Sequence, residues 1–279
     1  HKHVRSEKDI FSIEAMIESN VLKARQLLEL LMQHPPKHFF CVSTDKAANP
    51  VNIMGASKKL MEELIMAYSG KLKITTARFA NVAFSNGSLP QGFLERLNRR
   101  QPWSCPLGIK RFFVSPQESG ELCLIASLLG ESGDIIFPKL DDKRDMITFD
   151  VIANDLLKYL GMEADVCRTE EEARRKALEL NESSKTYPVY FFETDTSGEK
   201  PFEEFFTERE MIDNERFINL GVIKNSVKRD LSEIDGIFER LQALLASERV
   251  TKAAIVDILK TWLPDFEHIE KGKGLDSKM

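Results

Sequence analysis

The first 80 residues alternate helical patterns with continuous apolar runs, and this alternation constrains the fold more than any other feature. Apolar residues recur at helical spacing over 9–32, until a Pro-Pro pair ends the pattern. The run 38–43 shows no polar alternation, which is typical of a strand buried on both faces of a parallel sheet. A second helix is predicted over 51–68 and a second strand over 73–80. Because strands joined through helices lie parallel with right-handed crossovers, the sequence predicts an α/β fold with an incomplete doubly wound parallel sheet.

The alternation of helix and strand patterns becomes less regular after Val82, and the predicted elements are shorter. The patterns predict helices over 89–99, 116–129, 148–160 and 165–181, strands over 134–137 and 188–193, mixed short elements over 208–225, and amphipathic helices over 230–246 and 250–259. We therefore expect a smaller mixed α/β region after the parallel sheet, and helices at the C-terminal end. The predicted divisions are 1–83 for the sheet, 84–229 for the smaller region with elements that return to the sheet, and 230–279 for the helical extension.

Composition limits the partners. With a net charge of -5 and a pI of about 5.7, the chain lacks the excess of Lys and Arg that non-specific nucleic-acid binding needs, so no nucleic-acid partner is expected. No apolar stretch reaches the roughly 20 residues that span a bilayer, so no membrane segment is expected in this part of the chain. The four cysteines form no C-x-x-C pair, and no His/Cys cluster has metal-ligand spacing. We therefore expect reduced thiols, a cytoplasmic location and no metal site, while an upstream membrane anchor stays open because the sequence starts without Met.

Chemically capable side chains follow the first predicted strand. Parallel sheets bind ligands at the carboxyl ends of their strands, and Thr44, Asp45 and Lys46 place a hydroxyl, a carboxylate and an ammonium there. Further on, Met54 and Lys58 share one helical face through their i, i+4 spacing. Taken without a relative to compare with, these residues have plainer interpretations: a helix cap, solvated charges and, for Met54, core packing. Only their joint arrangement at a strand end favours a functional site.

The segment 42–59, VSTDKAANPVNIMGASKK, resembles the signature of the UDP-N-acetylglucosamine 4,6-dehydratases of bacterial capsule and glycan biosynthesis. These are extended short-chain dehydrogenases/reductases with a Rossmann-type sheet. Most such enzymes carry Tyr-x-x-x-Lys on this helix, whereas this branch combines S-T-D-K-A with Met at the Tyr position. Other segments resemble the same family: KHV at 2–4, RFANV at 78–82, KRFF at 110–113 and GEKPFEE at 198–204. The family's Gly-rich cofactor turn appears nowhere in this sequence, so we expect that part of the Rossmann domain to lie upstream.

The resemblance implies a three-step reaction on a UDP-N-acetylhexosamine, with UDP-N-acetylglucosamine as the expected substrate. NAD accepts a hydride from C4, water is eliminated across C5 and C6, and the hydride returns to C6. Asp45 would be the acid at C6, and Lys46 the base at C5 with its pKa lowered by the neighbouring charge of Lys58. Thr44 would bind O4, and Met54 would occupy the Tyr position.

The resemblance also implies the ligand contacts. NAD, with NADP as the alternative, would be tightly bound and recycled, and would be held by Lys58, Lys2 and Ser43. The UDP-sugar would be held by Asn81, Ser85, Ser88, Arg111 and Lys200, since Arg and Lys suit a diphosphate. The plainer interpretation of Arg111 and Lys200 is a surface salt bridge. A homo-oligomer that pairs through the long first helix is expected as well.

Two other functions stay open. A nucleotide-sugar C4 epimerase has the same fold, although it needs the Tyr that Met54 replaces. A non-catalytic module that binds a nucleotide sugar is the second, and the absence of the Gly-rich turn favours it.

Overall fold

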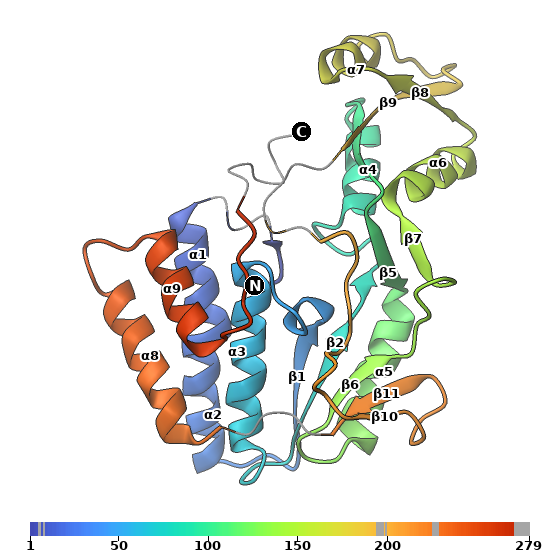
Figure 1. Ribbon diagram of the computed structural model, residues 1–279. Coiled ribbons are helices and arrows are strands. Elements are labelled where there is room, and N and C mark those ends of the chain that lie inside the picture. Colours follow the sequence, from blue (N-terminus) through green and yellow to red (C-terminus); the bar gives the residue numbers. More distant parts are fainter. Residues whose placement is uncertain (5–6, 8, 194–197, 199, 225–228, 271–279) are drawn as a thin grey trace.

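The computed structural model describes residues 1–4, 7, 9–193, 198, 200–224 and 229–270 (Figure 1). Its main sheet has the strand order β1 (Phe39–Thr44), β2 (Ile74–Phe79), β6 (Ile135–Pro138), β11 (Leu220–Ile223) and β10 (Ile212–Asp213). β1, β2 and β6 are parallel, whereas β11 runs antiparallel to both β6 and β10. The predicted parallel α/β sheet is confirmed. Its antiparallel edge, formed by β11 and β10, falls in the region where only mixed short elements were predicted.

Helices cover both faces of this sheet, as the doubly wound prediction requires (Figure 1). One face packs against α1 (Ile10–Ile17), α2 (Lys23–Gln33) and α3 (Ile53–Tyr68), and the other against α5 (Pro116–Leu129). Ile135 belongs to the first core cluster and its neighbour Ile136 to the second, because adjacent strand residues point to opposite faces. A π-helical turn, Glu18–Leu22, joins α1 to α2, so the predicted long helix is continuous but not regular.

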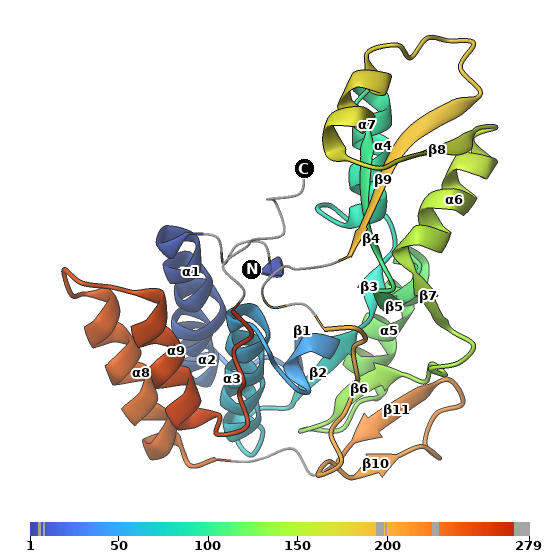
Figure 2. The ribbon, with the colours of Figure 1, turned by 45° about the horizontal axis from the view of Figure 1, so that its top comes forward.

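The C-terminal helices belong to the same core as the sheet. α8 (Leu231–Leu245) and α9 (Lys252–Trp262) lie outside α1 and α3 in both views (Figures 1 and 2). Their buried apolar residues join the cluster of α1 and α3: Ile234, Ile237, Phe238, Leu241, Ile255, Val256, Leu259 and Trp262. An ion pair of 2.6 Å between Arg25 and Asp235 fixes α8 against α2.

A second body of short strands and helices stands beside the main sheet (Figure 2). It contains two small sheets with the strand orders β3 (Asn81–Val82), β5 (Lys110–Val114), β7 (Met146–Thr148), and β4 (Trp103–Leu107), β9 (Thr186–Glu193), β8 (Glu163–Cys167). Three helices complete it: α4 (Leu89–Asn98), α6 (Phe149–Tyr159) and α7 (Glu170–Ala177). Phe93 stacks on Trp103 with ring centroids 4.6 Å apart at the centre of its core.

Two predictions about elements were wrong. The charged segment 165–181 is not one helix, because its first residues form the end of β8, and Thr169 then caps α7. α7 carries three acidic residues in its first turn and three basic residues in its last, which suits the helix dipole. β1 is not buried on both faces: Val42 is 48% exposed, since β1 is the edge strand of the sheet in the described part of the chain.

Across the described residues, no helix is both long enough and apolar enough to cross a membrane. All four cysteines are free thiols, as expected.

Candidate functional site

The motif residues lie where β1 ends and α3 begins. After Thr44 the chain forms a short 3-10 helix, Asp45–Ala47, and then α3 starts behind the cap Asn52. Asn52 accepts a hydrogen bond of 2.7 Å from the N–H of Gly55 and donates one of 2.8 Å to the carbonyl of Gly198. A Cβ at Gly55 would lie 2.5 Å from the carbonyl oxygen of Lys46, so only glycine lets α3 approach the Asp45–Ala47 segment this closely.

Asp45 and Lys46 form a buried acid–base pair. Asp45 is 2% exposed, and its Oδ1 accepts three hydrogen bonds: 2.8 Å from the Thr44 hydroxyl, 2.9 Å from the Lys46 N–H and 3.0 Å from the Lys46 ammonium. Its Oδ2 is equally inaccessible and has no hydrogen-bond partner in the described structure. A buried carboxylate oxygen without a donor is unfavourable, so this atom marks a place where a ligand hydroxyl or a proton would be stabilised.

A third charged residue completes this group. Glu203 is 3% exposed, and its Oε1 lies 3.9 Å from the Lys46 ammonium and 3.9 Å from the Arg111 guanidinium. The pKa of Glu203 is raised above its ordinary value, mainly because the carboxyl is buried. The negative charge of Asp45 adds to this rise, whereas the positive charge of Lys46 opposes it. Glu203 lies in the GEKPFEE segment, and no role was predicted for it. Its place in a segment that resembles the family was the one signal that could have pointed to it.

The expected lowering of the Lys46 pKa is wrong. Burial alone would lower it, but the charges of Asp45 and Glu203 outweigh burial and raise the pKa of Lys46 above its usual value. Arg111, not Lys58, is the cation that opposes them. The ammonium of Lys46 is therefore protonated at neutral pH in this arrangement.

Lys58 and Met54 lie on α3 as predicted, but in different surroundings. The ammonium of Lys58 donates to the carbonyl of Val42 at 3.3 Å and reaches Met61 Sδ at 3.9 Å, both weak partners. Burial lowers the pKa of Lys58, while Cys41 and Glu62 oppose that shift. Met54 is 1% exposed and packs in the main core, which agrees with its plainer interpretation.

Ser43 has a structural partner on α3, and its contact with the cofactor stays a prediction. Its hydroxyl donates a 2.6 Å hydrogen bond to Glu62 on α3. Glu62 in turn binds the fully buried guanidinium of Arg78 at 2.8 and 3.0 Å, and Glu210 binds the same guanidinium at 2.8 and 2.9 Å. The geometry therefore assigns Ser43 to this buried network.

Three of the five residues predicted to hold the UDP-sugar, Asn81, Arg111 and Lys200, have partners on β5 or on the loop beside it. Arg111 is 5% exposed, and it donates to the carbonyls of Lys110, Lys200 and Pro201 at 2.8, 3.0 and 3.4 Å, so it pins the 200–203 loop to β5 instead of forming a surface salt bridge. Lys200 pairs with Glu204 at 3.8 Å, and Asn81 donates to the carbonyl of Phe112 at 3.2 Å.

The other predicted ligand contacts lie nearer the N-terminal segment. The hydroxyl of Ser88 caps α4, and the Ser88 N–H donates to the carbonyl of Ser85 at 2.9 Å. A side chain at Gly87 would collide with the ring of His3, which places the first residues against this turn. Lys2 is exposed, and Glu199 lies outside the described residues. No cluster of three or more His, Cys, Asp or Glu suitable for a metal occurs in the described ranges.

Sequence comparisons connect this chain with polysaccharide biosynthesis. The profile described as "Polysaccharide biosynthesis protein" matches residues 1–224. The chain is 29% identical over 196 residues to an uncharacterized membrane protein from Methanocaldococcus jannaschii, covering 68% of this chain and 57% of the relative. It is 25% identical over 260 residues to the capsular polysaccharide biosynthesis protein CapD from Staphylococcus aureus, covering 91% of this chain and 39% of the relative. A Rickettsia felis protein named UDP-glucose 4-epimerase is 31% identical over 159 residues, or 55% of this chain and 45% of that protein.

Structure comparison supports the same fold. The dTDP-glucose 4,6-dehydratase DesIV from Streptomyces venezuelae, solved with NAD, superposes with a TM-score of 0.54 over 73% of this chain and 61% of that chain, at 17% identity. The chain spans 39 to 57% of the length of the sequence relatives named above. Because the profile covers most of the sequence, the chain belongs to the family described as polysaccharide biosynthesis protein.

Proposed function

We propose that the full-length protein is an NAD-dependent dehydratase that converts a UDP-N-acetylhexosamine, with UDP-N-acetylglucosamine as the first candidate, into its 4-keto-6-deoxy derivative. The observation that carries this proposal is the buried pair Asp45–Lys46, in which one carboxylate oxygen accepts three hydrogen bonds and the other accepts none. An elimination of water needs one acid and one base on neighbouring carbons, and this pair supplies both.

The raised pKa of Lys46 shapes how the pair would act. Lys46 is protonated and hydrogen-bonded to Asp45 at 3.0 Å before substrate enters. A bound sugar excludes water, which disfavours a buried ion pair relative to its neutral form. We propose that the proton then moves from the ammonium to the carboxylate, which leaves a neutral amine as the base for the C5 proton and a neutral carboxyl as the acid for the C6 hydroxyl. No proton enters or leaves the protein in this step.

The nicotinamide cofactor supplies the hydride acceptor at C4 and the hydride donor at C6. Lys58 fits a role at its ribose, because the two weak partners of its ammonium leave donors for a ribose hydroxyl. The edge of β1 that lacks a neighbouring strand in the described structure suits a further parallel strand of a Rossmann domain. NADP as the alternative cofactor, tight binding and the part of Lys2 stay predictions.

The predicted sugar-binding residues fit the proposal to different degrees. Thr44 is well placed, since its hydroxyl already bridges to Asp45 at 2.8 Å and can turn to O4 of a sugar. Ser85 and Ser88 lie on one turn, and Asn81 and Arg111 on the paired strands β3 and β5. Lys200 lies on the loop that Arg111 pins. We propose that these residues bind the UDP moiety.

The remaining proposals concern organisation. We propose that the divisions 1–83, 84–229 and 230–279 describe functional parts: β1 and β2 with the catalytic segment, the sugar-binding body with returning strands, and the helices α8 and α9. A cytoplasmic location and assembly into a homo-oligomer stay predictions.

The decisive experiment follows the sugar itself. Full-length protein would be incubated with UDP-N-acetylglucosamine in deuterated water, and the product would be analysed by NMR. A 4-keto-6-deoxy sugar with deuterium at C5 is expected. Asp45→Asn and Lys46→Ala should each lower kcat about 10²- to 10⁴-fold, whereas Lys71→Ala, which removes the same charge at an exposed turn, should leave it unchanged.

The pH dependence tests the proton transfer within the pair. Since the pair exchanges its proton internally, kcat should be nearly constant between about pH 6 and 9. A kcat that rises tenfold per pH unit through this range would mean that Lys46 must lose its proton to solvent first, and would refute the internal transfer.

A C4 epimerase is the second candidate, because relatives carry that name. The buried position of Met54 gives it no proton-transfer role, so an epimerase would need a different group. An epimerised product that keeps its C6 hydroxyl would favour this candidate over the dehydratase. Binding of the sugar with no product from several nucleotide sugars would favour a non-catalytic module.

A further inference from the structure

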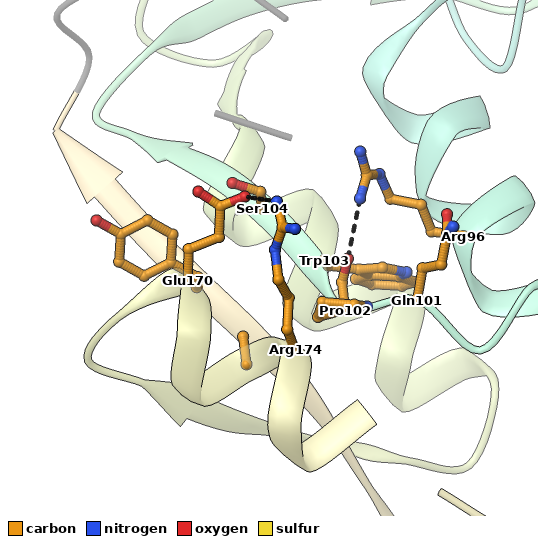
Figure 3. Close-up of a pocket in the computed structure, with 9 residues that line it drawn as sticks. Arg96, Gln101, Pro102, Trp103, Ser104, Glu170 and Arg174 are labelled. Carbon is orange, nitrogen blue, oxygen red and sulfur yellow. Dashed lines mark hydrogen bonds and ion pairs between the residues drawn. The ribbon is translucent and has the colours of Figure 1, made fainter. Parts of the chain in front are cut away.

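A pocket of about 260 Å³ lies in the second body, far along the chain from the catalytic segment (Figure 3). It is formed by the end of α4, the start of β4, the strand β9 and α7, and its lining residues are Arg96, Gln101, Pro102, Trp103, Ser104, Glu170, Ala173, Arg174 and Tyr190. None of the residues assigned above to catalysis, cofactor or substrate lines it. We propose that this pocket, the α4–α7 pocket, binds a small organic anion that carries a phosphate or carboxylate group.

Two arginines from separate helices, Arg96 on α4 and Arg174 on α7, line the pocket together with Glu170. Arg174 pairs with Glu170 at 2.6 Å, and among the described residues Glu170 is the only acidic one that lines the pocket. Arg96 has a weak hydrogen bond of 3.3 Å to the carbonyl of Pro102, and it forms no ion pair within the part of the chain that the structure describes. Figure 3 shows Arg174 and Glu170 meeting beside Ser104, with Arg96 reaching in from the side of Gln101. The pocket thus carries one positive charge in excess.

The charge on Arg96 is held in an unfavourable place. Burial lowers the pKa of Arg96. The negative charge of Glu170 raises this pKa, whereas the positive charge of Arg174 lowers it further. The Arg96 guanidinium, which has one weak hydrogen bond and no ion pair among the described residues, would be stabilised by an anion that it can bind in a bidentate manner. The planar forks of Arg96 and Arg174 match the oxygens of a phosphate or a carboxylate, which fixes the chemical class of the ligand.

The other walls suit an organic molecule better than a bare ion. The Trp103 indole N–H and the Ser104 hydroxyl are buried without hydrogen-bond partners. Pro102 and Tyr190, both partly exposed, line the pocket beside the two arginines and provide apolar surface. A volume of about 260 Å³ is close to the lower end of the usual range for small-molecule sites, roughly 300–1,000 Å³. A compact ring or short chain with an acidic group fits this combination.

The position of the pocket links it to the predicted sugar site. A second cavity of about 240 Å³ shares Arg96, Gln101 and Ser104 with it, and extends along α4 to the turn that carries Ser88. An anion in the α4–α7 pocket would therefore contact the same helix whose first turn Ser88 caps.

Isothermal titration calorimetry on the full-length protein tests the proposal, with inorganic pyrophosphate and citrate as separate probes. Binding of one or both is expected, and the probe that binds more tightly identifies phosphate or carboxylate as the preferred group. Arg96→Gln and Arg174→Gln should each weaken binding about tenfold or more, since each removes a charged hydrogen-bond donor. Glu170→Gln should strengthen it about two- to fivefold, because it removes the only opposing charge.

Arg175→Gln is the matched control. Arg175 is the next residue of α7, makes the same charge change, pairs with Glu179 at 3.4 Å and does not line the pocket, so its affinity should equal that of the unchanged protein. The proposal is overturned if neither probe binds at millimolar concentration. It is equally overturned if Arg96→Gln and Arg174→Gln bind as the unchanged protein does, which would put the anion elsewhere, or if Arg175→Gln weakens binding as much as they do.

Discussion

Glu210→Gln should destabilise the protein by about 3 kcal/mol at neutral pH and remove part of its acid sensitivity. The Glu210 carboxylate accepts hydrogen bonds of 2.8 and 2.9 Å from the fully buried Arg78 guanidinium, and Lys59 lies 3.5 Å away. These cations hold the pKa of Glu210 at about 2 although burial opposes them, against an ordinary value of 4.5. Each pKa unit corresponds to about 1.36 kcal/mol, so this difference amounts to about 3.4 kcal/mol of folding free energy.

The sign follows from the direction of the shift. A carboxylate whose pKa is lower in the folded state stabilises that state above the unfolded pKa, and the contribution disappears as the pH falls from 4.5 toward 2. The difference in unfolding free energy between the unchanged protein and Glu210→Gln should thus shrink from about 3.4 kcal/mol at pH 7 to about 1.4 kcal/mol at pH 3.

Urea unfolding followed by circular dichroism, repeated from pH 7 to pH 3, measures this difference. Glu208→Gln is the matched control, since Glu208 is exposed two residues earlier in the same loop, and it should change stability by less than about 0.5 kcal/mol. A loss below about 1 kcal/mol at pH 7, or a difference that stays constant down to pH 3, would refute the view that the Arg78 network depends on the charge of Glu210.

Three further substitutions test other parts of the structure by the same unfolding measurement. Glu203→Gln should destabilise the protein by less than Glu210→Gln, because burial raises the pKa of Glu203 and its ion pairs to Lys46 and Arg111 are both 3.9 Å long; a loss as large as that of Glu210→Gln would contradict this reasoning. Gly221→Ala should destabilise by about 1–3 kcal/mol, since its Cβ would lie 2.2 Å from the ring of Phe137, and a neutral result would mean that β11 can shift. Ser115→Ala should lose about 1 kcal/mol by removing the capping box of α5, and the far-ultraviolet signal should otherwise be unchanged.

The parallel core was predictable because helix and strand periods are strong in the first 80 residues and the apolar runs are long. The strands β4, β5 and β7 were missed because they have three to five residues each, too few to display a period. The helix predicted over 165–181 was wrong because high charge alone does not separate an edge strand from a helix.

Some features of the candidate site were predictable from the sequence, and others were not. Proximity along the chain was enough to group Thr44, Asp45 and Lys46. The electrostatics of that group were not predictable, because they depend on Glu203, which is more than 150 residues away in the sequence and reaches Lys46 only through the folding of the second body onto the first. The partner of Ser43 was unpredictable for the same reason, since strand periodicity does not say which side chain of α3 faces it.

The π-helical turn Glu18–Leu22 changes how this chain should be aligned with others. A π turn holds one residue more than an α turn, so it is equivalent to a single-residue insertion inside a helix. Removing one residue there would rotate α1 by about 100° relative to α2. It would also disturb Asn20, whose amide donates 2.9 Å to the hydroxyl of Ser57, the neighbour of Lys58. Alignments of relatives should therefore place a one-residue gap inside this helix, not in the loop that follows it, wherever a relative has a regular helix.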